Sequence, residues 1–509
     1  MLLVVVGVVP EWNNWGAPAP PVSLHPVLIP LPSCLSFAFF PQPEQGRAER
    51  SRGGHNCRLE QLQQSSGAHQ MASPSPQPGV RVLDQIPVSP PPASDSAQYP
   101  ALPLTFFDVA WLFTGPVERL FFFRHPDPAS TLPRLRSSLP VALRRFYPLA
   151  GTIRPRPPFL ISYAPGADAL TLVVAESDSP DDFDRLVART PRDLAGIRPL
   201  VPQLPPPGED GAFALAAVQV TLFPGHGLCL GVSVHHAACD DASTMHFVRT
   251  WAAACRLGIE SAGGSAEDAA LLLPPPPVLH RSVVADPDDL RGKTLAAAVA
   301  AGGGEAADAD GVIDRIKEGA AAKADGKVSS FVAASALAWV CLLKSGSTGV
   351  AGAERSHMLF SAECRSRLSP PLPAEYFGNC LRPCFVEAAA AELLSGDTAD
   401  GVAAAASAMG STIREMEQGV LDGAEGWLGR VMSVLPQRPM SVGGSPRHGV
   451  YDATDFGWGR PARVEMVSVE KTPGTVALAD CPEGDGGIEL GVVLPRDAMD
   501  AFASCFATI

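Results

Sequence analysis

The chain has 509 residues, of which 46% are hydrophobic, and it carries a formal net charge of −14 at pH 7. The length predicts two to four domains, and the hydrophobic content excludes wholesale disorder. The acidic balance argues against a general nucleic-acid binder, which would carry a basic surface. The eleven cysteines include no CxxC pair and have no histidine at metal-ligand spacing. This usage indicates reduced thiols in a cytosolic protein rather than disulfides or a metal site.

The first 70 residues differ in composition from the rest of the chain. Met1–Val9 is apolar but short, and prolines interrupt the apolar stretch Pro21–Phe40. Neither segment reaches the ~18–20 uninterrupted apolar residues of a membrane span, and neither has the form of a secretory signal. We interpret residues 1–70 as disordered or as a non-native extension before Met71. A targeting segment is the open alternative. We expect a cytoplasmic protein with no membrane partner.

Residues 71–255 alternate between strand-like and helix-like patterns. Apolar residues spaced by three or four over Leu132–Phe146 predict an amphipathic helix. Gly151, which follows it, is expected to adopt the positive φ of a helix stop, and Leu104–Asp108 is predicted as a turn. Further strands and helices are predicted at Gly79–Leu83, Glu118–Phe123, Phe159–Tyr163, Leu170–Val174, Asp181–Leu186 (helical), Phe213–Leu222, Leu228–Val234 and Phe247–Cys255 (helical).

Residues 256–310 are rich in glycine, alanine and proline, which predicts a crossover linker between two domains. The pattern of regular elements then resumes over residues 311–509. Helices are predicted at Val332–Lys344, Thr398–Gln418 and Arg496–Phe506, and strands at Met358–Ala362, Val464–Ser468 and Ile488–Val493.

The segment Val232–Asp241 carries the first candidate for chemistry. A strand-like run ends there in His235 and His236, and Asp240 follows His236 by four residues. Imidazole has an unperturbed pKa near neutrality, so His236 suits the work of a general base. Asp240 would be able to orient that ring, as in a Ser-His-Asp arrangement. An HxxxD pattern alone is common by chance.

Two further segments give the pattern its meaning: Tyr376–Cys380 reads YFGNC, and Asp455–Gly459 reads DFGWG. Together with HxxxD they resemble the plant BAHD acyltransferases, and YFGNC resembles the subgroup that acylates phenolic, flavonoid and anthocyanin glucosides. The resemblance implies an α/β (α+β), chloramphenicol-acetyltransferase-like fold with two similar-sized domains of mixed β-sheet and flanking helices. Residues 71–255 would form the domain with HxxxD, and residues 311–509 the domain with YFGNC and DFGWG.

The resemblance also implies an activity: transfer of an acyl group from an acyl-CoA co-substrate, here malonyl-CoA, to a sugar hydroxyl. His236 would act as the base without an acyl-enzyme, and the protein would be a monomer with no permanent cofactor. Alternative donors are hydroxycinnamoyl-CoA or other acyl-CoAs, with a hydroxyl or amine acceptor. A catalytically silent binding protein is a third hypothesis. The acceptor and its acylated position stay open.

For the other site residues the resemblance implies supporting roles. Asp240 would pair with an arginine, either Arg365 or Arg367, instead of polarising His236. Trp458 would donate to the oxyanion or only shape the structure. The family's usual glycine after the motif aspartate is replaced by Asp241, which leaves the local geometry open. The residues expected on the CoA or substrate side are Ser329, Ser330, Arg365, Arg367, Asp455, Gly457 and Gly459.

Overall fold

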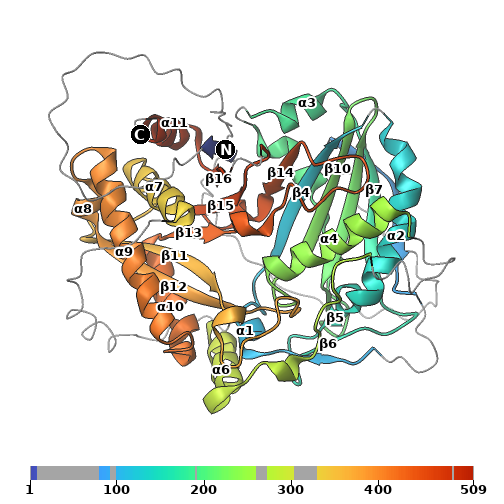
Figure 1. The fold of residues 1–509 in the computed structure, drawn as a ribbon, viewed down its shortest axis with the longest axis horizontal. Coiled ribbons are helices and arrows are strands. Elements are labelled where there is room, and N and C mark those ends of the chain that lie inside the picture. Colours follow the sequence, from blue (N-terminus) through green and yellow to red (C-terminus); the bar gives the residue numbers. More distant parts are fainter. Residues whose placement is uncertain are drawn as a thin grey trace, which may run out of the picture.

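The computed structural model describes residues 2–7, 79–91, 99–125, 127–189, 192–259, 272–302, 329–483 and 486–507. Two six-stranded sheets dominate it, side by side in Figure 1, and each mixes parallel and antiparallel strands. This arrangement confirms the predicted fold of mixed sheets with flanking helices. Nearly all of the elements predicted from sequence periodicity are present, with ends shifted by a few residues.

The first sheet has the strand order β14-β4-β10-β9-β7-β2. A small four-stranded sheet, β3-β6-β5-β8, lies at its end. The bounds of this half are β2 (Val80–Val88), β3 (Leu102–Pro103), α1 (Phe106–Val109), β4 (Pro116–Arg124), α2 (Leu132–Arg145), β5 (Thr152–Ile153), β6 (Leu160–Ser162), β7 (Leu170–Ser177), α3 (Asp182–Val187), β8 (Phe213–Ala214), β9 (Ala216–Phe223), β10 (Gly227–His235), α4 (Asp241–Leu257), α6 (Leu290–Gly302) and β14 (Arg463–Met466).

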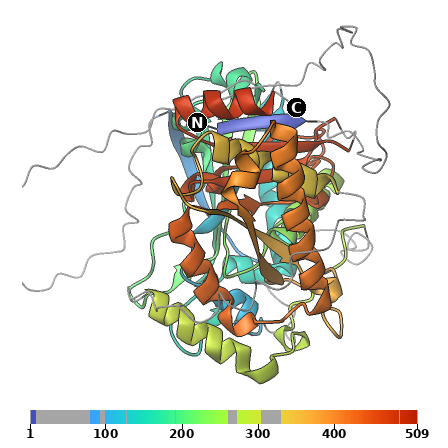
Figure 2. The same cartoon turned by 90° about the vertical axis from the view of Figure 1, so that its left-hand side faces the viewer.

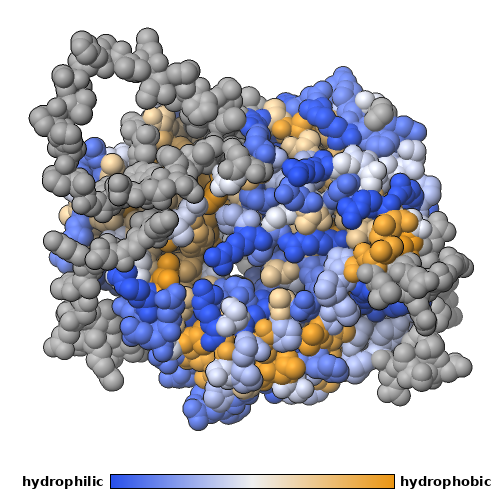
Figure 3. All heavy atoms as spheres, in the orientation of Figure 1, coloured by the Kyte–Doolittle hydropathy of each residue, from blue (hydrophilic) through white to orange (hydrophobic). Residues whose placement is uncertain are grey.

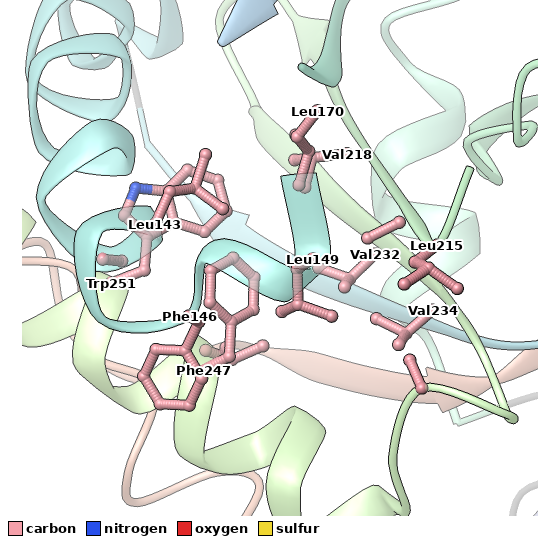
Figure 4. Close-up of a cluster of buried hydrophobic side chains, with 14 of the residues drawn as sticks. Leu143, Phe146, Leu149, Leu170, Leu215, Val218, Val232, Val234, Phe247 and Trp251 are labelled. Carbon is pink, nitrogen blue, oxygen red and sulfur yellow. The ribbon is translucent and has the colours of Figure 1, made fainter. Parts of the chain in front are cut away.

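Helices α2 and α4 pack together over one face of the first sheet. In Figure 4, Leu149 lies between the α4 side chains Phe247 and Trp251 and the β10 side chains Val232 and Val234, and all of these belong to one buried cluster. Every residue of β10 is buried, so this strand runs through the centre of the core. The carboxyl end of β10 is therefore held rigidly. His236 follows directly after this end and begins the next turn.

The second sheet has the order β1-β16-β15-β13-β11-β12, and beside it helix α7 packs against both α9 and α11. Their buried residues form a second core. The bounds are β1 (Leu2–Gly7), α7 (Ser330–Lys344), β11 (Arg355–Glu363), β12 (Leu381–Ala389), α8 (Ala390–Leu394), α9 (Thr398–Gln418), α10 (Trp427–Val434), β13 (Met440–Gly443), β15 (Thr475–Asp480), β16 (Ile488–Val493) and α11 (Arg496–Phe506).

Two strands, one near each end of the chain, pair with strands that are distant in sequence. β14, from the C-terminal part of the chain, pairs with β4 in the first sheet. β1 pairs with β16 at the edge of the second sheet, on the same side as α11 (Figure 2). Within residues 1–70, which the sequence predicted to be disordered or non-native, the structure describes Leu2–Gly7 alone and gives them a strand. The rest of that prediction lies outside the described residues.

Three local predictions differ from the structure. Leu104–Asp108 is not only a turn, because Thr105 caps the short helix α1. The predicted linker 256–310 contains helix α6, which packs against α1 and α10. Gly151 has φ −97, so the predicted positive φ is wrong. Glycine is required there for space, because a Cβ at residue 151 would lie 2.2 Å from the carbonyl oxygen of Ser162.

Candidate active site

His236 stands between strand β10, which ends at His235, and helix α4, which begins at Asp241. The backbone turns sharply there, with the amide of Ala238 donating to the carbonyl of His235. His236 is half-buried, whereas His235 is buried. The Nδ1 atom of His235 accepts from the amide of Ala237 at 3.2 Å, and burial lowers the pKa of His235 to about 4. His235 is therefore a neutral, structural histidine.

The His236 ring is held by Asn379 of the YFGNC segment. Asn379 Nδ2 donates to two groups that can only accept, the His236 carbonyl at 2.8 Å and Asp108 Oδ1 at 3.0 Å. These bonds fix which end of the amide is nitrogen, so Asn379 Oδ1 is the atom 3.1 Å from His236 Nδ1. Since an amide oxygen only accepts, Nδ1 carries the proton. Nε2 is then the unprotonated nitrogen, the form that a general base needs.

Asp108, at the third position of α1, anchors this arrangement and is fully buried. Its Oδ1 accepts from both the backbone and side-chain nitrogens of Asn379, each at 3.0 Å. Its Oδ2 accepts from the amide and hydroxyl of Thr105 at 2.9 and 2.7 Å, and Arg281 lies 3.4 Å away. The carboxylate thus joins α1, the YFGNC segment and the turn of His236.

The electrostatics of His236 favour the neutral ring. Burial lowers its pKa, while the charges of Asp240 and Asp241 and the bond to Asn379 partly oppose that shift. A neutral imidazole can accept a proton from a hydroxyl. Burial also raises the pKa of the neighbouring Cys239 thiol, so this cysteine holds its proton and is a poor nucleophile.

Asp240 points into an ion pair with Arg365. The shortest contact, from Arg365 Nη1 to Asp240 Oδ2, is 2.8 Å, and both side chains are almost fully buried. Asp240 also caps α4 by accepting from the amide of Ser243 at 3.0 Å, and it accepts from the amide of Cys380 at 3.2 Å. Burial alone would lower the pKa of Arg365, but Asp240 raises it. Of the two arginines left open by the sequence, Arg365 is the partner.

Arg365 extends the ion pair into the YFGNC segment, because its Nη2 donates to the carbonyls of Tyr376 and Gly378 at 3.0 Å each. Asp240 therefore reaches His236 indirectly, by fixing the segment that carries Asn379. Arg367, in contrast, is exposed and donates to the carbonyl of Glu363 at 2.6 Å.

Asp241 is accommodated as the first residue of α4. Its Oδ2 lies 2.7 Å from Arg119 Nη2 of β4 and 2.6 Å from His448 Nδ1. Burial would raise the pKa of Asp241, but Arg119 and His448 together lower it. The residue that departs from the family pattern thus adds an ion pair beside the turn of His236, between the first sheet and the loop after β13.

DFGWG forms a tight turn away from His236. Asp455 Oδ1 accepts from the amides of Gly457 and Gly459 at 2.7 and 2.9 Å, and both glycines have positive φ, 108 and 97. Trp458 packs on Phe123, which lies seven residues along β4 from Pro116, the partner of His235. At ~3.3 Å per residue this is roughly 23 Å. Trp458 therefore cannot donate to an oxyanion formed beside His236, and this part of the sequence prediction is corrected.

Ser329 and Ser330 lie at the start of α7, where both are exposed and Ser329 caps the helix through the amide of Val332 at 3.3 Å. Their role towards CoA stays a prediction. Figure 3 shows the surface hollowed near its middle, where the two halves meet. Within the described part of the chain, no helix has the length and apolar character to cross a bilayer, and no His, Cys, Asp and Glu side chains gather in a metal-like group.

The sequence missed two members of this site, Asp108 and Arg281. Asn379 was part of the YFGNC motif but was not assigned to the site. The position of Asn379 inside that motif is the signal that could have found it. Asp108 belongs to no such motif and lies 271 positions before Asn379 in the sequence. Only the fold brings these residues together.

The family profile described as the Transferase family matches residues 90–508. The chain belongs to this family. A coumaroyl-CoA:anthocyanidin 3-O-glucoside-6''-O-coumaroyltransferase of Arabidopsis thaliana is 32% identical over 83% of this chain and 96% of its own length. A malonyl-coenzyme:anthocyanin 5-O-glucoside-6'''-O-malonyltransferase of Salvia splendens is also 32% identical, over 84% and 94%. These relatives confirm the BAHD resemblance and the expectation that the chain is an acyltransferase, and both are named for a coenzyme-linked acyl donor.

The crystal structure of vinorine synthase superposes with a TM-score of 0.50 at 20% identity, covering 83% of this chain and 96% of the other. This likeness confirms the predicted chloramphenicol-acetyltransferase-like fold of the BAHD acyltransferase.

Proposed function

We propose that this BAHD acyltransferase transfers a malonyl group from malonyl-CoA to a sugar hydroxyl of a phenolic, flavonoid or anthocyanin glucoside. The observation that carries the proposal is the His236–Asn379 hydrogen bond of 3.1 Å, which leaves Nε2 of a neutral imidazole as the proton acceptor. We further expect a cytoplasmic monomer.

In this mechanism His236 Nε2 removes the proton from the acceptor hydroxyl as its oxygen attacks the thioester carbonyl. The tetrahedral intermediate collapses, the carbon–sulfur bond breaks, and the imidazolium returns its proton to the CoA thiolate. Acid–base help of this kind is worth roughly 10²–10⁴-fold, and holding two substrates together supplies more. No acyl-enzyme forms, so no nucleophilic serine or cysteine is required.

The names of the relatives support both the acceptor class and the donor. Malonyl transfer to anthocyanin or phenolic glucosides is named for several of them, at 30–32% identity. A malonyl donor carries a free carboxylate that needs a cation. Arg365 is committed to Asp240, so another basic residue would have to bind that carboxylate.

Coumaroyl-CoA is the second candidate donor. The specific observation in its favour is that a named coumaroyltransferase is as similar to this chain as the named malonyltransferases, at 32%. An aromatic donor needs no cation for its acyl group, so no basic residue beyond Arg365, which is committed to Asp240, would be required.

The test is a mass-spectrometric transfer assay on the full chain, which keeps β1. Malonyl-, acetyl- and coumaroyl-CoA are each offered with a panel of flavonoid and simple phenolic glucosides. A malonyl adduct on the sugar that disappears in His236→Ala supports the proposal. The matched control is His226→Ala, which lies immediately before the first residue of β10 and should retain activity. Adducts from coumaroyl-CoA alone would replace the donor, and transfer that survives in His236→Ala would refute the mechanism.

A further inference from the structure

Trp111 covers one face of the His236 ring. The two ring centroids lie 3.8 Å apart and the planes differ by 7°, which is a close parallel stack. Both side chains are half-buried. The indole therefore excludes water from one face of the imidazole, while Asn379 holds the ring at Nδ1.

A single hydrogen bond at Nδ1 leaves the imidazole free to rock about the line that joins Nδ1 to Asn379 Oδ1. A flat ring at 3.8 Å removes that freedom, because any tilt brings imidazole atoms into the indole. The two contacts are complementary, since one fixes a point in the plane of the ring and the other fixes the plane.

The Asn379 hydrogen bond and the Trp111 stack both depend on the short helix α1. Asp108 of α1 binds Asn379, and the amide of Trp111 donates to the carbonyl of the same Asp108 at 3.0 Å. The hydroxyl of Thr114 then closes the turn by donating to the carbonyl of Trp111 at 2.8 Å. The turn that ends α1 thus carries the indole at a fixed distance from the catalytic ring.

We propose that Trp111 is a positioning residue for acyl transfer, and that its indole holds the plane of His236 so that Nε2 meets the acceptor hydroxyl. The inference rests on the proposed role of His236 as the base. A flat aromatic ring is what the geometry uses, so phenylalanine should substitute for tryptophan at position 111, and leucine should not.

The first test compares Trp111→Phe, Trp111→Leu and Trp111→Ala in steady-state kinetics. A misplacement of ~1 Å in a reacting group costs about 10²-fold in rate. We therefore expect kcat to fall about 10- to 100-fold in the leucine and alanine variants, with the KM for acyl-CoA within about twofold. Trp111→Phe should stay within about threefold. A leucine variant with wild-type kcat, or a loss confined to KM, would overturn the proposal.

The matched control is Trp427→Leu. Trp427 is also half-buried, and its ring lies 6.5 Å from Phe107 of α1, but it stacks beneath Arg382 rather than over His236. Its kcat should stay within about twofold of the wild type. An equal loss in Trp427→Leu would show that removing any tryptophan near α1 disturbs the fold, and would refute the specific role of Trp111.

The second test needs no substrate, so it separates this inference from the proposed function. Diethyl pyrocarbonate modifies accessible neutral histidines, and tandem mass spectrometry locates the carbethoxyl group on His236 or on buried His235. We expect His236 to react at least about fivefold faster in Trp111→Ala than in the wild type or in Trp427→Leu. Equal rates would overturn the hold of Trp111 on the ring. If no acyl transfer is detected in the kinetic assay but His236 still reacts about fivefold faster with diethyl pyrocarbonate in Trp111→Ala, the proposed function is refuted and the positioning role of Trp111 stands.

Discussion

Replacing Asn379 by alanine is the sharpest test of the role proposed for His236, because it removes the group that sets the tautomer of the ring. The variant loses the acceptor 3.1 Å from Nδ1 and the two Nδ2 bonds, to Asp108 and to the His236 carbonyl. A neutral hydrogen bond contributes about 0.5–1.5 kcal/mol net. Loss of the Nδ1 bond alone thus predicts a roughly 2- to 13-fold fall in kcat.

Freeing the ring adds to this loss, because a displacement of ~1 Å reduces rate by about 10²-fold. We expect kcat to fall by about 10²-fold or more, with the KM for acyl-CoA changed less than about twofold. The assay is initial-rate acyl transfer with the best donor and acceptor of the wild type, with Gln203→Ala as a control for loss of a side-chain amide. Wild-type kcat in Asn379→Ala would refute the tautomer argument.

Four further outcomes are expected. Asp240→Ala should lower the free energy of unfolding by up to roughly 3–5 kcal/mol, because it removes the buried partner of Arg365 and leaves only the partly exposed Glu363, 3.1 Å away. Chemical denaturation measures this, and an unchanged midpoint would contradict the ion pair. Asp241→Gly should destabilise the protein, because it removes the partner of the buried Arg119. The folded pKa of Asp241 is lowered, so its contribution to stability is fully present above the unfolded pKa and declines as pH falls from there towards the folded pKa. The difference in stability between the wild type and the variant should therefore shrink in acid. The acidic limb of kcat/KM should lie below pH 6.5, because burial lowers the pKa of His236 and the neutral ring is the active form; a limb above 7 would argue against this base. Trp458→Phe should leave kcat within about threefold, and a 10²-fold loss would reinstate an oxyanion role.

Local periodicity was enough to predict most elements of the fold. The helices Thr398–Gln418 and Arg496–Phe506 have the predicted bounds, because spacing of apolar residues reports which face is buried. His236 was found for a similar reason, since a polar pair ending an apolar strand is visible in one short segment. Helix α6 was missed because its alanine-rich sequence resembles a linker and carries little apolar periodicity.

Long-range geometry was beyond the sequence. The distance of Trp458 from His236 depends on the register of β4 against β10, which sets Phe123 opposite Leu228, and no local pattern encodes that register. The bond between Asn379 and Asp108 likewise joins segments 271 residues apart. The choice of Arg365 over Arg367 depended on which guanidinium turns inward after β11.

The two neighbouring carboxylates show how the fold prepares the turn of His236. Asp240 binds Arg365 of the second half, and Asp241 binds Arg119 of β4 and His448 beyond β13. Buried ion pairs are a weak source of stability, because desolvation offsets much of their attraction, but they tolerate few alternative arrangements. The ionic contacts therefore serve geometry, since the segment that Arg365 holds carries the Asn379 amide that orients the ring.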